Sequence, residues 1–280
     1  MTIVAVLGMG LLGRGFAENL LAKGHVVRVW NRTASRCAPL VERGAVAAAT
    51  PEEAVRGAAR VHLVLAEDSA VDAVIDALRP GLAAGVYIVD HSTNLPARVA
   101  ARFARLRAAG VHYVHAPVFM GPSNSRDATG LMLLSGPPAD EAALRPALET
   151  MTGRVLHLGA EPDRAAKLKL TGNGLLIMLT ATMGDLFRMG QASGVSTDEV
   201  LALFDLFSPT ASGMGRRALG ASTQPVAFEL QMARKDVRLM LETAGDAKLT
   251  VLPAVAAAMD AALAAGRGAE DFAVIADPRR

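Results

Sequence analysis

The sequence of 280 residues has little cysteine, few aromatic residues and almost no excess of one charge. Its single cysteine, Cys37, excludes an internal disulfide and is typical of a reducing compartment. Because a reactive thiol needs an activating environment, Cys37 is interpreted as a packing residue. The 29 basic and 27 acidic residues give a formal net charge of +2, which indicates no nucleic-acid partner.

Long hydrophobic runs are missing as well. No uninterrupted apolar segment reaches the ~18 residues that a membrane span needs. The apolar N-terminal segment lacks the basic region and the cleavage signal of an export peptide, and it continues directly into a glycine motif. The sequence therefore predicts a soluble, cytoplasmic protein without membrane contact, and its hydrophobic content of 51% predicts a sizeable folded core.

Short apolar runs alternate with helical patterns over the first 160 residues. Strands are predicted at 3–7, 26–30, 61–65, 86–89 and 155–158. Helices are predicted from about Leu11 to Lys23, after a cap at Thr50, and around Val71 to Leu78. Alternating strands and helices indicate a mostly parallel sheet covered on both faces. We therefore expect an α/β, Rossmann-type doubly wound domain over residues 1–160.

The pattern changes beyond residue 160. One long helical stretch, from about 163 to 190, is apolar on nearly every side. Such a helix is expected to be buried all round, between two domains or two subunits. Further helices are predicted at 197–207, 225–245 and 253–265. Residues 161–280 are therefore predicted to form an all-α domain for substrate binding and oligomerisation, joined to the first by the long helix.

A glycine motif follows the first predicted strand and opens the first predicted helix, the context that dinucleotide binding requires. Gly8 permits a tight turn, Gly10 lets a pyrophosphate approach the backbone, and Gly13 lets helix and strand pack closely. The predicted cofactor-binding residues of this turn are Gly8, Met9, Gly10, Leu11, Leu12 and Gly13.

The end of the second predicted strand indicates which nicotinamide cofactor is bound. NAD-binding proteins place a carboxylate there for the ribose 2′-OH. This chain instead has Asn31, Arg32 and Thr33, with Arg36 one helical turn further on. A guanidinium with amide and hydroxyl neighbours suits a 2′-phosphate. The sequence therefore predicts NADP in preference to NAD.

Further segments occur in a fixed order along the chain: Glu18–His25 after the glycines, Asp90–Thr93, Ala116–Val118, Lys169–Asn173, Phe228 and Lys235-Asp236. With these segments, the chain resembles the β-hydroxyacid dehydrogenase family over essentially its whole length. This family includes 3-hydroxyisobutyrate dehydrogenases, tartronate semialdehyde reductases and glyoxylate/succinic semialdehyde reductases. The resemblance implies a 6-phosphogluconate dehydrogenase-like C-terminal domain, a small carbonyl or hydroxy-acid substrate, no metal, and a homodimer or homotetramer.

Lys169 lies in the long helix, where a buried lysine is unfavourable without a purpose. Carbonyl reduction needs a proton donor, and an ammonium serves if burial lowers its pKa from about 10.4 toward the working pH. Asn173, four residues later, lies on the same helix face. The family's Lys-x-x-x-Asn pattern implies that Lys169 is the acid/base and Asn173 its partner. Lys167 is a rival on another face, but it has no amide four residues on.

The resemblance also assigns residues elsewhere. By analogy, Leu65, Ala66 and Thr93 line the nicotinamide–ribose end of the cofactor, and Lys235 lies near the cofactor. The residues implied for substrate binding are Ser92, Phe119, Met120, Gly121, Asn173, Phe228 and Asp236. Without the resemblance, Lys235 and Asp236 would be interpreted as an exposed pair on an amphipathic helix.

The substrate loop departs from the family pattern, which usually reads Ala-Pro-Val-Ser-Gly-Gly. Here Phe119 replaces the serine whose hydroxyl helps to bind the substrate carboxylate, and Met120 replaces a glycine. Together they form an apolar wall. Either other groups hold the carboxylate, such as Ser123, Asn124 or backbone amides, or the substrate is less anionic.

Three functions remain open on the sequence. The first is an NADPH-dependent reductase of a small aldehyde or keto acid, reversible as a 3- or 4-hydroxy acid dehydrogenase. The second is an imine or uncharged-carbonyl reductase on the same scaffold, which the apolar loop would suit. The third is a non-catalytic NADP-binding protein. Retention of Lys169 favours the first, because imine reductases and inactive relatives generally lack this lysine.

Overall fold

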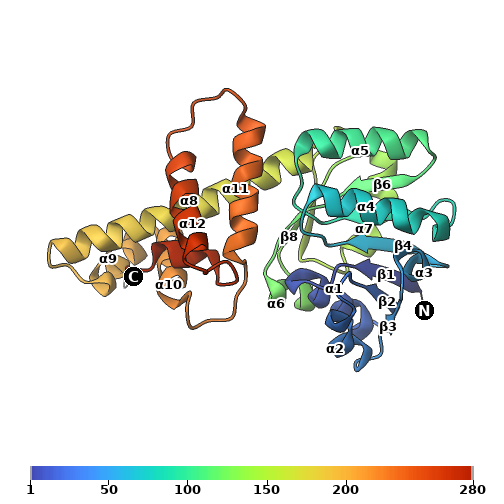
Figure 1. Cartoon of the computed structure of the whole chain (residues 1–280), viewed down its shortest axis with the longest axis horizontal. Coiled ribbons are helices and arrows are strands. Elements are labelled where there is room, and N and C mark those ends of the chain that lie inside the picture. The colour runs from blue at the N-terminus through green and yellow to red at the C-terminus, as the bar shows by residue number, and fades with distance from the viewer. Residues whose placement is uncertain (1, 279–280) are drawn as a thin grey trace. The chain divides into compact units, whose positions relative to one another are not determined.

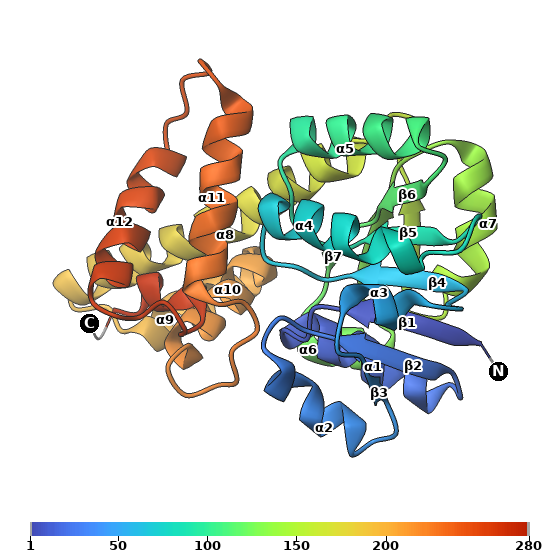
Figure 2. The same ribbon diagram turned by 45° about the vertical axis from the view of Figure 1, so that its right-hand side comes forward.

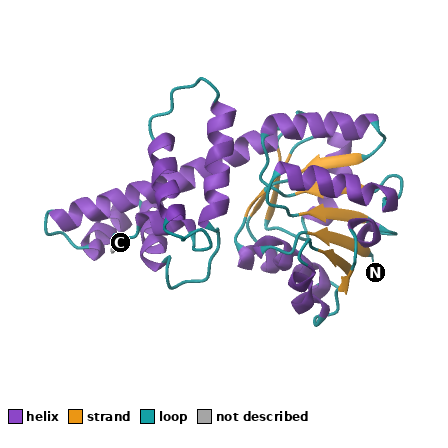
Figure 3. Ribbon diagram, viewed as in Figure 1, coloured by secondary structure: helices purple, strands orange, loops and turns teal. Residues whose placement is uncertain are grey.

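The computed structural model describes residues 2–278. The chain divides into two compact units, residues 1–169 and 170–280. All strands of the described part lie in the first unit, and the second is helical (Figure 3). The Rossmann-type α/β fold followed by a helical region is therefore confirmed.

The first unit is built on a six-stranded parallel sheet with the strand order β3-β2-β1-β4-β5-β6. The strands are β1 (Ile3–Leu7), β2 (Val26–Trp30), β3 (Val46–Ala47), β4 (Arg60–Leu63), β5 (Tyr87–Asp90) and β6 (His112–His115). The connecting helices are α1 (Leu11–Ala22), α2 (Ala38–Val41), α3 (Pro51–Val55), α4 (Asp68–Leu78) and α5 (Pro96–Ala108). The order reverses between β1 and β4, and ligands of such sheets bind beside the carboxyl ends of the strands at this switch point.

Alternation along the strands divides the core of this unit between the two faces of the sheet. Val4 and Val6 of β1 belong to a cluster with Phe16 of α1, whereas Ala5 and Leu7 pack in a cluster with α4 and α5. Figure 1 shows α4 and α5 together on one face and α1 on the other. The sheet is thus buried on both sides, as the near-continuous apolar strands predict.

A second, three-stranded sheet completes the first unit, with the order β7-β8-β9. Its strands are β7 (Val118–Phe119), β8 (Leu131–Leu134) and β9 (Arg154–His157), and β7 runs antiparallel to β8. Helices α6 (Pro122–Asp127) and α7 (Pro138–Leu148) lie between these strands in sequence. Sequence reasoning predicted β9 within one residue but missed β3, β6, β7 and β8. Strand β7 carries the start of the loop that is predicted to bind substrate.

The second unit consists of helices. They are α8 (Arg164–Ala192), which begins in the first unit, α9 (Thr197–Phe207), α10 (Pro209–Gly220), α11 (Leu230–Ala244), α12 (Leu252–Ala264) and the 3-10 helix η3 (Phe272–Ala276). Met183 and Phe187 of α8 pack against Leu201 of α9 and Ala211 of α10. In Figure 2, α11 and α12 lie side by side, joined by the loop that follows α11.

One prediction for this unit was wrong. The helix predicted from residue 225 begins only at Leu230, because the backbone N–H groups of Ala227 and Phe228 donate to the Asp271 carboxylate instead of continuing a helix. Burial of α8 between two domains or two subunits stays a prediction; in the single chain, Leu175 is 62% and Met189 is 64% exposed. Helix α10 was not predicted, and its three glycines, one serine and one threonine explain the weak helical signal.

Helix α8 is, within residues 2–278, the one helix that is long and apolar enough to cross a membrane by length and composition. In its most apolar window, 44% of the residues are buried inside the protein. The core helix of a soluble protein passes the same test, so this finding is weak evidence for a membrane span.

Candidate functional site

The glycine turn between β1 and α1 has the geometry of a dinucleotide-binding turn. Gly8 has a φ of +106°, and a Cβ at this position would lie 2.2 Å from the carbonyl oxygen of Val64. A Cβ on Gly13 would lie 1.8 Å from the carbonyl oxygen of Gly8. A Cβ on Gly10 would meet nothing within 4 Å. The protein itself therefore requires glycine at 8 and 13, whereas the open side of Gly10 suits the close approach of a ligand.

The amino end of α1 suits an anion. Among the described residues, no side chain caps this end, where Gly10 is the N-cap. The first N–H groups of a helix lack partners within it and attract phosphate. The N–H of Met9 points elsewhere, because it donates to Oδ1 of Asn31 at 3.0 Å. The residues present thus fit the pyrophosphate of a dinucleotide.

Basic side chains lie beyond the carboxyl end of β2. Arg32, Thr33 and Arg36 are exposed there. Asn31 is engaged on both sides of its amide, since Nδ2 also donates to the carbonyl oxygen of Thr33 at 2.9 Å. Asn31 therefore shapes this loop, and the two arginines and the Thr33 hydroxyl are the exposed groups that can reach a ligand phosphate.

Two loops at the carboxyl ends of β4 and β5 contain the residues predicted for the nicotinamide end. The N–H of Leu65 donates to Oγ of Ser92 at 2.9 Å, so the two loops are directly joined. Ser92 is buried, Thr93 is half-buried and Ala66 is exposed. The backbone N–H of Ser92 donates to Oδ1 of Asp90 at 2.9 Å. The structure thus brings Leu65 and Ser92 together within the first unit.

A chain of buried histidines lies beneath the β5 loop. Nε of Arg60 donates to Nε2 of His62 at 2.7 Å, so the hydrogen of His62 must be on Nδ1. That nitrogen faces Nε2 of His91 at 2.8 Å, and Nδ1 of His91 faces the carbonyl oxygen of Ala116 at 2.7 Å. Each ring therefore donates once and accepts once. This series of hydrogen bonds ends at the carbonyl oxygen of Ala116, where the loop that is predicted to bind substrate begins.

Burial controls the charge of these histidines. It lowers the pKa of His91 to about 4, although the carbonyl of Ala116 and the Asp90 carboxylate act in the opposite direction. Burial, reinforced by the Arg60 guanidinium, holds the pKa of His62 well below its usual value. Burial also lowers the pKa of His115, whose Nε2 faces the carbonyl oxygen of Ser92 at 2.9 Å. All three rings are neutral near neutral pH, which suits a supporting role.

The altered substrate loop uses several of its polar groups internally. The N–H of Gly121 donates to Oδ1 of Asn124 at 2.9 Å, and Nδ2 of Asn124 donates to Oγ1 of Thr129 at 2.9 Å. Ser123 is exposed, whereas Phe119 and Met120 are half-buried. Of the groups considered for holding a carboxylate, Asn124 and the amide of Gly121 are therefore already engaged.

Lys169 and Lys167 differ sharply. Lys169 is only 8% exposed, and its Nζ donates to the carbonyl oxygen of Val118 at 2.7 Å. The same Nζ lies 4.2 Å from the centroid of the Phe119 ring, a cation–π distance. Lys167 is exposed and paired with Glu161 and Asp163. Within the first unit, the structure therefore brings Lys169 to the substrate loop, while Lys167 belongs to a surface ion-pair group.

The second unit gathers the predicted residues that follow Lys169. Nδ2 of Asn173 donates to Oδ2 of Asp236 at 2.7 Å, and Nζ of Lys235 lies 2.6 Å from Oδ1 of the same carboxylate. Asp236 is buried, so the exposed-pair interpretation of Lys235 and Asp236 does not hold. Phe228 takes no part in this hydrogen-bonded group, and its ring packs edge-on against the ring of Phe272.

Sequence reasoning missed one group of residues beside the site. Asp90, at the end of β5, is surrounded by Asn94, Tyr113 and Arg102, and Arg102 also pairs with Asp68. The only signal in the sequence was the aspartate that opens Asp90–Thr93. The other three residues come from separate helices, strands and loops, and local patterns do not show that they converge.

Comparisons with known proteins agree with this geometry. A family model described as the NAD binding domain of 6-phosphogluconate dehydrogenase matches residues 3–159, more than half of the chain. The chain is 29% identical to glyoxylate/succinic semialdehyde reductase 1 of Arabidopsis thaliana over 282 residues, which covers 97% of this chain and 96% of that protein. It is 28% identical to 3-sulfolactaldehyde reductase of Escherichia coli (strain K12), covering 100% and 96% of the two chains.

Solved structures show the same fold. A 3-hydroxyisobutyrate dehydrogenase from Salmonella typhimurium superposes with a TM-score of 0.87 at 20% identity, covering 99% of both chains. An imine reductase from Myxococcus stipitatus in complex with NADP+ reaches a TM-score of 0.67 at 22% identity, covering 98% of both chains. At these identities the likeness concerns the fold alone. Together with the family model and the reductase relatives, it shows that the chain belongs to the β-hydroxyacid dehydrogenase family and is an oxidoreductase that binds a nicotinamide cofactor.

Proposed function

We propose that this protein is an NADP(H)-dependent reductase of a small aldehyde or keto acid, reversible as a 3- or 4-hydroxy acid dehydrogenase, with Lys169 as general acid/base. The observation that carries the proposal is the buried ammonium of Lys169, donating to the carbonyl of Val118 beside the substrate loop. The activities named for two relatives, a glyoxylate/succinic semialdehyde reductase and a sulfolactaldehyde reductase, support small acidic aldehydes as the substrate class.

The proposed chemistry assigns one task to each group. The bound cofactor supplies the hydride. Nζ of Lys169 donates a proton to the carbonyl oxygen of the substrate and takes it back in the reverse direction. Asn173, one helical turn further along α8, is proposed to bind that oxygen or to orient the ammonium; the Asp236 carboxylate holds its amide in place. The Phe119 ring, 4.2 Å from Nζ, excludes water from one side of the ammonium.

The preference for NADP is part of the proposal. It is supported by the exposed arginines Arg32 and Arg36 beyond β2, where an NAD-binding site would carry a carboxylate. We further propose residues 1–160 as the cofactor domain, 161–280 as the substrate and oligomerisation domain, and a homodimer or homotetramer in the cytoplasm without nucleic-acid or membrane partners.

NADPH oxidation tests the proposal. The panel contains glyoxylate, succinic semialdehyde, methylmalonate semialdehyde, uncharged aldehydes and cyclic imines. Lys169→Ala should lower kcat roughly 100- to 10,000-fold, the usual contribution of acid–base catalysis, with NADPH binding intact. Lys167→Ala is the matched control, because it removes an exposed lysine two residues away on the same helix and should leave kcat unchanged.

Two results would redirect the assignment. Turnover of imines or uncharged carbonyls alone would support the alternative reductase and would reflect the apolar Phe119 wall. NADPH binding with no turnover of any panel member would support a non-catalytic NADP-binding protein. Activity retained in Lys169→Ala would remove the acid/base role from Lys169 whatever the substrate.

A further inference from the structure

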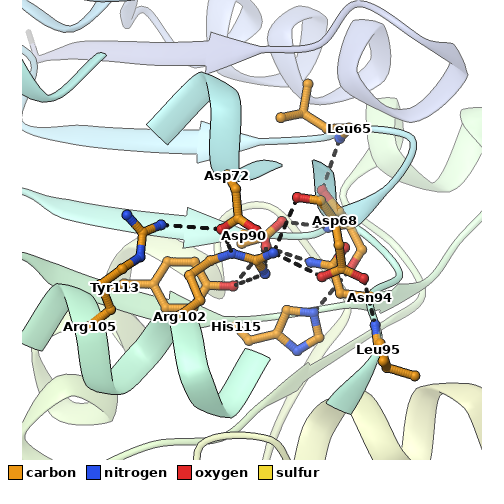
Figure 4. Close-up of polar contacts among 11 residues, drawn as sticks. Leu65, Asp68, Asp72, Asp90, Asn94, Leu95, Arg102, Arg105, Tyr113 and His115 are labelled. Carbon is orange, nitrogen blue, oxygen red and sulfur yellow. Dashed lines mark hydrogen bonds and ion pairs between the residues drawn. The ribbon is translucent and has the colours of Figure 1, made fainter. Parts of the chain in front are cut away.

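A buried arginine lies at the centre of an acidic cluster (Figure 4). The cluster lies beside the β4–α4 and β5–α5 loops, which contain the residues predicted for the nicotinamide end of the cofactor. The Arg102 side chain, from α5, is 1% exposed. Its guanidinium lies 2.8 Å from an oxygen of Asp68, 2.8 Å from an oxygen of Asp72 and 3.8 Å from an oxygen of Asp90. Its N–H groups thus point toward carboxylates from two separate elements, α4 and β5.

Asp90 is the innermost of these carboxylates, and its exposed fraction is 0%. Oδ1 accepts the N–H of Ser92, while Oδ2 accepts Nδ2 of Asn94 and the hydroxyl of Tyr113, both at 2.8 Å. Burial and the Asp90 charge raise the pKa of Tyr113 well above its usual value, so the phenol remains a donor. The Asp90 carboxylate therefore fixes the backbone at Ser92. The Arg102 guanidinium compensates the buried negative charge of Asp90.

Asp68 connects the same arginine to the start of α5. It is the first residue of α4, directly after the loop that contains Leu65 and Ala66. Oδ1 of Asp68 binds Arg102, and Oδ2 accepts the backbone N–H of Leu95 at 2.9 Å. With the bond from Leu65 to Ser92, this contact joins the β4–α4 and β5–α5 loops at a second place.

We propose that Arg102 is a positioning residue, which locks these two loops to each other so that Leu65, Ala66, Ser92 and Thr93 hold the nicotinamide half of the cofactor in a reactive orientation. The inference rests on the proposed function, because it gives these loops a task in hydride transfer. A buried ion pair is poor evidence of stabilisation, since apolar residues of similar volume often stabilise a protein as well or better. What the arginine provides here is geometry, because its rigid fork contacts Asp68 and Asp90, the residues that flank the two loops.

Arg105 supplies a matched control. It lies three residues further along α5, is 44% exposed, and pairs with Asp76 and with the same Asp72. The contacts of Arg105 include neither Asp68 nor Asp90. Arg105→Gln therefore removes an arginine from the cluster but leaves the contacts between the loops intact.

The experiment compares wild type, Arg102→Gln, Tyr113→Phe and Arg105→Gln. Each is assayed for kcat with NADPH, for NADPH affinity, and for affinity toward 2′-phospho-AMP, which represents the adenosine half of the cofactor. Misorienting reacting groups by about 1 Å costs roughly 100-fold in rate, so Arg102→Gln should lose about 10- to 100-fold in kcat. Its affinity for 2′-phospho-AMP should stay unchanged, because the glycine turn and the β2 arginines are untouched. Arg105→Gln should match wild type.

Tyr113→Phe keeps the test decisive if Arg102→Gln does not fold. It removes one hydroxyl that donates to Asp90 and accepts from Arg102, in a side chain that otherwise keeps its shape. Loss of one such hydrogen bond should lower kcat roughly fivefold, again with 2′-phospho-AMP binding unchanged. Equal kcat in all folded variants, or a parallel loss of 2′-phospho-AMP binding, overturns the positioning role. A wild-type protein that binds no NADPH refutes the proposed function itself, and the inference falls with it.

Discussion

Acid pH should destabilise the first unit through His91, which is 3% exposed and bonded on both ring nitrogens. Its pKa falls to about 4 in the folded protein, mainly because of burial, against 6.5 for an exposed histidine. Below about pH 6.5, the imidazole of His91 becomes protonated in the unfolded chain, whereas in the folded chain it stays neutral down to about pH 4. The stability contributed by the neutral ring is therefore complete above about 6.5 and is lost as the pH falls toward 4. The full difference corresponds to about 3 kcal/mol, since each pKa unit is worth ~1.4 kcal/mol.

The hydrogen bonds of His91 explain why protonation of its ring is unfavourable in the folded protein. The added hydrogen would lie on Nε2 of His91, which already accepts from Nδ1 of His62 at 2.8 Å. Two N–H groups would then face each other in a buried site. The resulting loss of unfolding free energy should be about 2 kcal/mol between about pH 7 and about pH 4.5.

Urea unfolding followed by fluorescence measures this loss. Trp30 is the single tryptophan and lies in the first unit, so its signal reports the unit that contains His91. His91→Gln keeps one donor and one acceptor but does not titrate. This variant should lose less stability than wild type over the same pH range, even if it is less stable at pH 7. His157→Gln, which removes a half-buried histidine, is the control. Parallel stability–pH curves for wild type and His91→Gln would refute the reasoning.

Three further predictions concern other parts of the chain. Gly13→Ala should lower both the melting temperature and the NADPH affinity, because its Cβ would lie 1.8 Å from the Gly8 carbonyl oxygen. Gly10→Ala should weaken NADPH binding alone, because its Cβ would meet nothing within 4 Å. Equal melting temperatures for the two variants would contradict this prediction. Arg32→Gln should lower kcat/KM for NADPH about tenfold and leave that for NADH unchanged, as expected when one charge-assisted bond to a 2′-phosphate of ~1.4 kcal/mol is removed; an equal loss with both cofactors would place the arginine elsewhere. Asp271→Asn should destabilise the second unit by about 3 kcal/mol, because this buried carboxylate accepts from Arg217 and from three backbone N–H groups; an unchanged urea midpoint by circular dichroism would exclude this role.

The elements that could be predicted from the sequence are those whose signal is local. The strands at 3–7 and 26–30 were predicted at their observed bounds, because each is a short apolar run beside a glycine or polar turn. Glycines 8 and 13 are required by contacts within the same turn or with the adjacent strand. For Lys169 and Asn173, helical spacing is likewise local, so their shared face on α8 could be predicted without a structure.

The features that were missed depend on segments that meet only in the folded chain. Arg102 belongs to a helix rich in arginine, and nothing in its neighbourhood distinguishes it from the exposed Arg105. Its burial follows from Asp68 and Asp90, which are 34 and 12 positions away along the chain. The start of α11 could not be predicted for the same reason, since Asp271 lies over 40 residues beyond the N–H groups that it binds. Patterns of polarity do not report such pairings.

The continuity of α8 has a consequence for protein engineering. Lys169 ends the first compact unit and Asn173 lies in the second, yet both are set on one helix without an intervening break. Because an α-helix turns by about 100° and rises about 1.5 Å per residue, inserting a single residue between them would rotate the amide off the face of the ammonium. Chimaeras that exchange the helical unit with that of a relative must therefore keep the helical phase across the junction. A junction within a loop tolerates insertions and deletions. A junction within α8 must keep the number of residues between Lys169 and Asn173 unchanged.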